Sequence, residues 1–186
     1  HMNSTFQIEH NRLFGELREV LKTDIARITG KANGGRSILF VYPPKDDDAY
    51  IAYAKENFNP DTYSFIDLRS LFTEFVSERG LEQFQENYKE FSNEVFFSDN
   101  FYEETFFCYV MNRIETSYQS HKIPVLIHTG TIYGMGFSNI NIMEHQIVMR
   151  AQLPLIVFYP AIIVDKDTIK FLGKQIASKY RCIVIK

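Results

Sequence analysis

Continuous runs of apolar residues alternate along this chain with segments in which apolar residues recur every three or four positions. The continuous runs have the length of strands that are buried on both faces, as in a parallel sheet. They predict strands at Ser37–Tyr42, Tyr63–Leu68, Val125–His128, Leu155–Tyr159 and Cys182–Ile185.

The segments with three-to-four spacing predict amphipathic helices between these strands. The acidic run Asp46–Asp48 suits the first turn of one of them, because carboxylates stabilise the positive end of a helix dipole. The predicted helices are 8–28, Asp47–Asn57, Leu71–Arg79, Leu81 to about Phe91, Phe101–Ser120 and Asn141–Met149.

This alternation predicts one α/β domain over residues 1–186, with an N-terminal helix at 8–28 and a sheet core at 37–186. The expected architecture is a three-layer sandwich, Rossmann-like without a nucleotide motif, around a mainly parallel sheet of about five strands. A strand order such as 2-1-3-4-5 would place the loops 43–48 and 129–138 side by side at one rim of the sheet.

Composition and charge narrow the function classes. The net charge of −3 and the pI near 6.0 disfavour autonomous nucleic-acid binding. The sequence has no signal peptide and no apolar run long enough to span a membrane, so we expect no membrane partner. Cys108 and Cys182 lie in apolar segments, which predicts buried free thiols and a cytoplasmic location.

The glycine-rich turn in VLIHTGTIYGMGFS is the first candidate site. Its backbone amides could bind an anion before the following helix, at a site formed by Thr129, Gly130, Gly134, Gly136 and Ser138. The turn contains no lysine or arginine, so the other interpretation is a set of tight turns in which Ser138 or Asn139 caps the helix. The facing loop, YPPKDDD, has no phosphate-binding motif and three aspartates that repel anions, so we predict no nucleotide cofactor.

Two histidines and the aspartate run are candidates for catalysis or metal binding. His128 ends a predicted strand, and His145 follows Glu144 in a predicted helix, but neither occurs in an HxxxH or HExxH pattern. No GxSxG elbow is present for nucleophilic catalysis. We therefore predict no catalytic or metal-binding residue, and expect His128 to be hydrogen-bonded at its strand end.

Large apolar side chains in the same turn predict a protein-binding surface. Tyr133, Met135 and Phe137 are costly to expose in a flexible loop without a purpose, and Tyr42 and Pro43 belong to the neighbouring loop. The alternative is that one or two of these side chains fold back onto the sheet. The lysines near the C-terminus (Lys166, Lys170, Lys174 and Lys179) and Arg181 are interpreted as a solvated face.

The segments SILFVYPPKDDDAY, YSFIDLRSLF, VLIHTGTIYGMGFSNINIMEH, LPLIVFYP and IKFLG together resemble the BrxB family of BREX phage-defence systems. The resemblance extends from about Ile38 to the C-terminus. The matching positions are Tyr42, Pro43, Thr129, Gly130, Ser138, Tyr159, Pro160, Phe171, Leu172 and Gly173. The chain departs from the family pattern in the loop AIIVDKD after Pro160 and in the extra glycines of GMG.

The resemblance implies a small cytoplasmic bacterial protein without established enzymatic activity that binds the PglZ-like, phosphatase-fold component of the same system. The leading expectation is therefore a protein-interaction module. The alternative is an anion- or nucleotide-binding domain, or an enzyme, with its site between the 43–48 and 129–138 loops, with or without a divalent ion.

Overall fold

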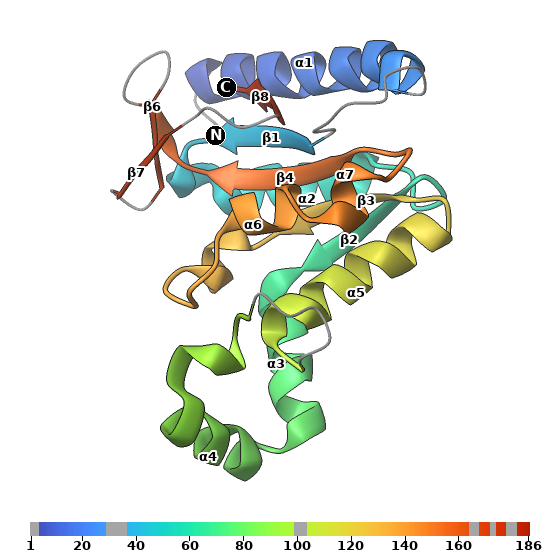
Figure 1. The fold of residues 1–186 in the computed structure, drawn as a ribbon. Coiled ribbons are helices and arrows are strands. Elements are labelled where there is room, and N and C mark those ends of the chain that lie inside the picture. Colours follow the sequence, from blue (N-terminus) through green and yellow to red (C-terminus); the bar gives the residue numbers. More distant parts are fainter. Residues whose placement is uncertain (1–3, 29–36, 99–103, 164–167, 172–173, 178–181) are drawn as a thin grey trace.

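A five-stranded parallel sheet forms the centre of the computed structural model, which describes residues 4–28, 37–98, 104–163, 168–171, 174–177 and 182–186 (Figure 1). The strands follow the order β2-β3-β4-β1-β8. Their bounds are β1 Ser37–Tyr42, β2 Tyr63–Asp67, β3 Ile123–Ile127, β4 Leu155–Pro160 and β8 Cys182–Ile185. The predicted α/β architecture is confirmed, and each predicted strand is present with its bounds shifted by two residues or fewer.

The expected strand order, 2-1-3-4-5, is wrong. Strand β4 lies between β1 and β3 and pairs with β1 along its whole length, from Ser37 opposite Leu155 to Tyr42 opposite Pro160. An apolar run reveals that a strand is buried on both faces, but it carries no information about which strands are its neighbours.

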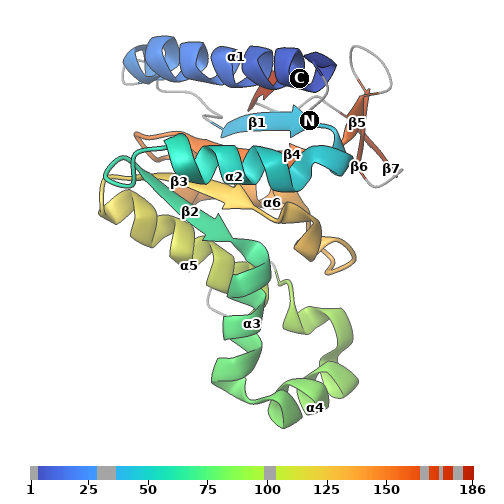
Figure 2. The ribbon, with the colours of Figure 1, turned by 180° about the vertical axis from the view of Figure 1, so that it is seen from behind.

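Helices cover both faces of the sheet and give it three layers (Figures 1 and 2). One face packs against α1 (Ser4–Ile28) and α2 (Asp47–Asn57). The other packs against α3 (Leu68–Arg79), α5 (Phe106–Gln119), α6 (Asn139–Met143) and α7 (Gln146–Met149). Successive side chains of β1 alternate between the two layers, so that Phe40 is buried under α1 and α2 while Leu39 and Val41 are buried on the opposite face.

Local caps explain where two helices differ from their predicted bounds. Helix α5 begins at Phe106, because the Thr105 hydroxyl accepts a hydrogen bond from the Cys108 amide at 3.2 Å and caps the helix there. The predicted helix Asn141–Met149 is divided into α6 and α7, because His145 has an extended backbone. Ser138 begins α6 with a capping box, as one interpretation of the turn predicted.

A second, antiparallel sheet lies between β4 and β8 in sequence and was not predicted. It consists of β5 (Ile162–Ile163), β6 (Thr168–Phe171) and β7 (Lys174–Ala177). Lys170 and Lys174 belong to its strands, whereas Lys166, Lys179, Arg181, Leu172, Gly173 and the glycine-rich segment 30–35 lie outside the described residues.

Helix α4 (Leu81–Phe91) and the 3-10 turn η2 (Ser92–Val95) extend away from the sheet beyond α3 (Figure 1). Gly80 joins α3 to α4 with φ +81°, a backbone conformation that favours glycine. No residue of α4 is buried, which distinguishes it from α3, α5 and the long helix α1. Among the described residues, no helix combines the length and apolar character needed to cross a bilayer.

Candidate functional site

Polar side chains from three strand ends meet at the carboxyl edge of the sheet. Asp47 and Asp48 begin α2, shortly after β1 and the 3-10 turn η1 (Pro44–Asp46). Asp67 is the last residue of β2, and His128 directly follows β3. The connection after β1 runs to one face of the sheet and those after β2 and β3 run to the other. In open α/β sheets, ligands bind outside the carboxyl ends of the strands, where such connections diverge.

Asp67 holds His128 and also begins α3. Its Oδ1 lies 2.8 Å from His128 Nδ1 and accepts hydrogen bonds from the backbone amides of Arg69 (3.0 Å) and Ser70 (3.3 Å). Burial alone would raise the pKa of Asp67, but the hydrogen bonds from His128 and Ser70 outweigh it and lower that pKa below its usual value. Asp67 is therefore ionised at neutral pH.

These contacts determine which nitrogen of His128 carries the proton. Arg69 Nη2 lies 3.3 Å from His128 Nε2, and a guanidinium can only donate, so Nε2 accepts and Nδ1 donates to Asp67. His128 has φ +52° and ψ +43°, a left-handed conformation that is uncommon outside glycine and asparagine. The Thr131 hydroxyl donates to the His128 carbonyl at 2.8 Å and helps to hold this backbone.

Asp47, Asp48 and His128 form a group that could hold a cation; we call these three residues the rim triad. One ligand atom from each lies within 4.8 Å of the other two. Carboxylates and a neutral imidazole are suitable ligands for Zn²⁺ or Mn²⁺. Because Asp67 engages Nδ1, the nitrogen available for a cation or a substrate proton is Nε2, which Arg69 now faces. Sequence spacing missed the triad because its members come from loops 80 positions apart that the fold brings together.

Tyr42 contacts the rim triad through Asp47. Because Tyr42 is buried, the prediction that it is a partner-binding residue is corrected. Its side chain is buried, stacks on Tyr50 with ring centroids 4.4 Å apart, and donates a hydrogen bond from its hydroxyl to Asp47 Oδ1. Burial, and then the charge of Asp47, raise the pKa of Tyr42, so the phenol stays protonated. Pro43 is half-buried beside it.

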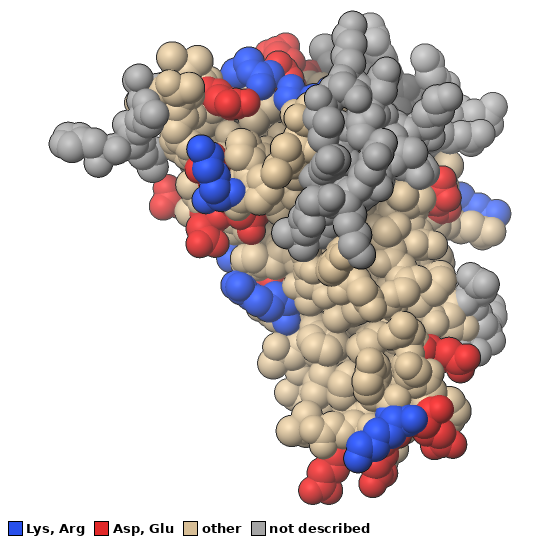
Figure 3. Space-filling model, turned by 90° about the vertical axis from the view of Figure 1, so that its left-hand side faces the viewer, with Lys and Arg blue, Asp and Glu red and all other residues tan. Residues whose placement is uncertain are grey.

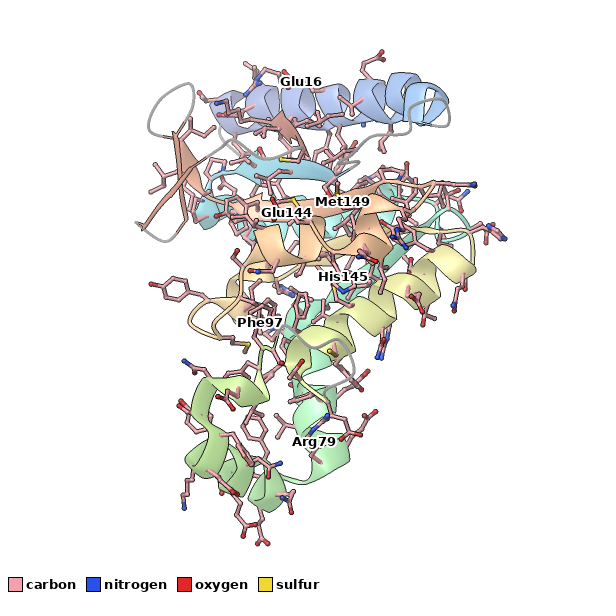
Figure 4. All side chains as sticks on the ribbon, viewed as in Figure 1. Glu16, Arg79, Phe97, Glu144, His145 and Met149 are labelled. Atoms are coloured by element: carbon pink, nitrogen blue, oxygen red, sulfur yellow. The ribbon has the colours of Figure 1, made fainter. Side chains whose placement is uncertain are left out.

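The predicted partner surface in the glycine-rich turn is reduced to Tyr133. Tyr133 is 44% exposed, whereas Met135 and Phe137 are buried, which corrects the expectation for these two residues. The Phe137 ring lies 5.7 Å from Phe97 and 5.2 Å from Phe107, measured between centroids. Figure 4 shows Phe97 beside the turn. The turn therefore folds back on the core, as the alternative interpretation allowed.

Several polar groups of this turn form hydrogen bonds within the protein, and the alternative anion site stays a prediction. The amides of Thr131, Tyr133 and Met135 donate to carbonyls of the turn itself, and the Thr129 hydroxyl donates to the Phe158 carbonyl at 2.7 Å. Gly134 and Gly136 have φ of +80° and +86°, which is the reason the turn needs glycine there. Of the predicted anion-binding residues (Thr129, Gly130, Gly134, Gly136 and Ser138), Thr129 bonds through its hydroxyl to the Phe158 carbonyl and Ser138 through its amide to the Asn141 side chain.

A separate apolar surface lies on α4. Leu81, Tyr88 and Phe91 are 61%, 45% and 49% exposed, although each is a large apolar residue. The glycine-rich turn lies close to η2, which follows α4. A Cβ added to Gly136 would lie 3.9 Å from the Cβ of Asn93 in η2. The sequence predicts the helix α4 but no role for it. The spacing of its apolar residues does not reveal whether that side of the helix is buried or exposed.

The two cysteines offer no reactive site. Cys108 is buried and Cys182 half-buried, and neither thiol forms a disulfide in the described part of the chain, as predicted. Burial raises the pKa of the Cys182 thiol, which lowers its reactivity.

Comparisons with protein-family models, with curated proteins and with solved structures found no match. The likeness to the BrxB family therefore rests on the sequence patterns alone.

Proposed function

We propose that this protein is a non-enzymatic component of a bacterial BREX-type phage-defence complex, and that it acts in the cytoplasm by binding a PglZ-like partner. The likeness to the BrxB family supplies the identity of the partner. The observation that carries the interaction is that Leu81, Tyr88 and Phe91 of α4 are 61%, 45% and 49% exposed.

The energetics of α4 favour a binding role. Most of the stability of a protein helix comes from burying an apolar face, because helix propensity alone is marginal at this length. Helix α4 has eleven residues and buries none of them, and three of its large apolar side chains remain 45% to 61% exposed. Contiguous exposed apolar surface of this kind marks interaction sites in soluble proteins.

Tyrosine and phenylalanine on this surface suit a protein partner. Tyrosine is enriched among the residues that dominate binding energy, because its ring buries a large area at low entropic cost. Tyr88 on α4 and Tyr133 on the neighbouring turn are both about half exposed. We expect both to contact the partner.

Co-purification tests this proposal. The tagged chain is produced together with the PglZ-like protein of a BREX locus, and the complex is isolated by affinity and size-exclusion chromatography. We expect a stable complex that Y88A/F91A weakens at least tenfold and that I8A, at an exposed position on α1, leaves unchanged. Failure of the wild-type chain to bind the PglZ-like protein would contradict the proposal.

A second candidate function, a cation-dependent enzyme, is favoured by the rim triad. In it, Asp47, Asp48 and His128 Nε2 would hold a divalent cation, and Asp67 would orient the imidazole, as carboxylates commonly do for metal-binding histidines. Arg69 beside Nε2 would face an anionic substrate or the developing charge of a reaction. The alternative expected from the sequence placed an enzyme site in the same region, between the 43–48 and 129–138 loops.

Thermal unfolding with Mg²⁺, Mn²⁺ or Zn²⁺, with and without nucleotides, tests this second function. A ligand at about 100 times its Kd adds about 2.7 kcal/mol to the free energy of unfolding, so the melting temperature should rise by several degrees. D47N/D48N should abolish the rise, whereas D61N, at an exposed position, should preserve it. An unchanged melting temperature with every ion and nucleotide would eliminate this candidate.

A further inference from the structure

Arg69 faces the nitrogen that a cation at the rim triad would need. Its Nη2 atom lies 3.3 Å from His128 Nε2, while Asp67 Oδ1 lies 2.8 Å from Nδ1 on the other side of the ring. A neutral imidazole has one nitrogen with a free lone pair, and the contact with Asp67 makes that nitrogen Nε2. Arg69 and a metal ion therefore compete for a single lone pair.

The two carboxylates of the triad form no ion pair with a lysine or arginine in the described part of the chain. Asp47 and Asp48 begin α2, where the helix dipole stabilises carboxylates. The dipole does not account for the His128 imidazole, which comes from a different loop and lies within 4.8 Å of both. Together the three side chains offer a divalent cation two negative charges and one nitrogen ligand.

Two of the three ligands are held by groups behind them, whereas Arg69 is free to move. The buried Tyr42 hydroxyl donates to Asp47 Oδ1, and Asp67 holds the His128 ring. Such second contacts are typical of metal ligands, because they fix the direction of the donor atoms. Arg69 is exposed, and among the described residues its guanidinium makes no contact other than the one with Nε2. It can therefore turn into water at low cost.

The rim triad lies at an edge of the sheet that solvent reaches. The arrowheads of β1 and β4 point to the left in Figure 1, and Figure 3 looks onto that side of the molecule. Acidic and basic side chains lie close together on the left of this view, beside a broad surface without charges. Asp48 is exposed, and Asp47 and His128 are half-buried. A cation can thus approach the triad from solvent.

We propose that the rim triad binds a first-row divalent metal ion, represented by Zn²⁺, in exchange for Arg69. His128 Nε2 would pass from the guanidinium to the metal, and Asp47 and Asp48 would supply carboxylate oxygens. An imidazole ligand favours Zn²⁺ over Mg²⁺, which prefers oxygen ligands. The inference rests on the second candidate function and deepens it, by giving the class of cation and the group that opposes its binding.

Calorimetric titration of the full chain with Zn²⁺ and with Mg²⁺ tests the site. We expect Zn²⁺ to bind at least tenfold more tightly than Mg²⁺. H128N should abolish this Zn²⁺ binding, whereas H121N should keep it. Both histidines have a left-handed backbone, with φ of +52° and +56°, which asparagine tolerates. In NMR spectra of ¹⁵N-labelled histidine, Zn²⁺ should shift the His128 Nε2 resonance and leave Nδ1 protonated.

Removal of the guanidinium tests the exchange. R69M should tighten Zn²⁺ binding about three- to tenfold, because the metal no longer has to displace a hydrogen bond. K45M is the matched control, since it removes an exposed cation two positions before Asp47. It should tighten binding less than R69M does. Circular dichroism and the melting temperature establish that every variant is folded.

Three outcomes would overturn the inference. If neither the wild type nor R69M binds Zn²⁺, the second candidate function fails with it. If Mg²⁺ binds as tightly as Zn²⁺, or if R69M and K45M tighten Zn²⁺ binding equally, the exchange is wrong but a cation site remains. Zn²⁺ binding with the expected order of variants supports the inference whether or not a PglZ-like protein binds, so the interaction function is tested separately.

Discussion

His145 shows how one side chain serves both a helix cap and the core. Its Nδ1 accepts a hydrogen bond from the Ile147 amide at 3.1 Å and so begins α7. Its ring lies 5.8 Å from the Phe107 ring, between α7 and α5 (Figure 4). Burial lowers the pKa of His145 below 6.5, and the charge of Glu115 only partly opposes this shift.

We predict that this histidine makes the protein less stable in mild acid. The unfolded state takes up the proton at about pH 6.5, before the folded state does. The free energy of unfolding should therefore fall from pH 6.5 downward and level off below the lowered pKa of the folded state, by about 1.4 kcal/mol for each unit between the two pKa values. H145N retains a capping acceptor without titrating, so its urea denaturation should depend less on pH.

Exposed His121 provides the matched control. It lies in a left-handed turn that asparagine also tolerates, so H121N should keep the wild-type pH dependence. Burial also lowers the pKa of His10, which lies among aromatic rings, so we expect H145N to keep part of the acid sensitivity. Identical pH profiles for H145N and the wild type would exclude the role given to His145.

Phe137 and Tyr133 belong to the same turn but should respond oppositely to truncation. F137A removes a buried ring that packs on Phe97 and Phe107, and we expect it to cost about 3–5 kcal/mol of unfolding free energy. Y133A changes an exposed side chain and should cost less than about 0.5 kcal/mol. Chemical denaturation checks both values, and a similar loss in the two variants would show that Tyr133 is also part of the core.

At the scale of elements, β2, α3 and the end of β3 are joined through Asp67. One carboxylate oxygen caps α3 and bonds to the His128 imidazole, which is largely buried. D67A should therefore lose about 1–3 kcal/mol of unfolding free energy at pH 7, through the missing cap and the unpaired Nδ1–H group. Because the pKa of Asp67 is lowered, its contribution is present above pH 3.8 and disappears as the pH falls through the lower value of the folded state.

D67N and D61A complete this measurement by urea denaturation. Asparagine can still cap α3, so D67N should lose less stability than D67A. D61A changes an exposed aspartate in the turn before β2 and should be close to the wild type. Equal stability of D67A and D61A would mean that the Asp67 contacts contribute nothing measurable.

At the scale of the whole molecule, stability is distributed unevenly between the sheet and the α4 extension. Strands β1, β3 and β4 are buried along their length, whereas α4 has no buried residue. We predict that backbone amides of α4 exchange with deuterium about 100-fold faster than those of the central strands, which corresponds to about 2.8 kcal/mol of opening free energy. Equal protection of α4 and β3 in the free protein would contradict this picture.

The amino-acid sequence by itself determined the α/β class, the five strands of the main sheet and most of the helices. It could do so because the apolar pattern follows directly from whether an element is covered on one face or two. It also predicted Ser138 as a possible cap and the burial of the Cys108 thiol, since both depend on neighbouring residues in the chain.

Only the tertiary structure decided the strand order, the burial of Tyr42, Met135 and Phe137, and the rim triad. Each of these depends on residues distant in sequence that share a strand end or a face, and the spacing of residues along the chain does not encode such contacts. The exposure of α4 has the same cause. Its apolar residues have the spacing of a core helix, and the position of α4 beyond the sheet leaves Leu81, Tyr88 and Phe91 partly exposed.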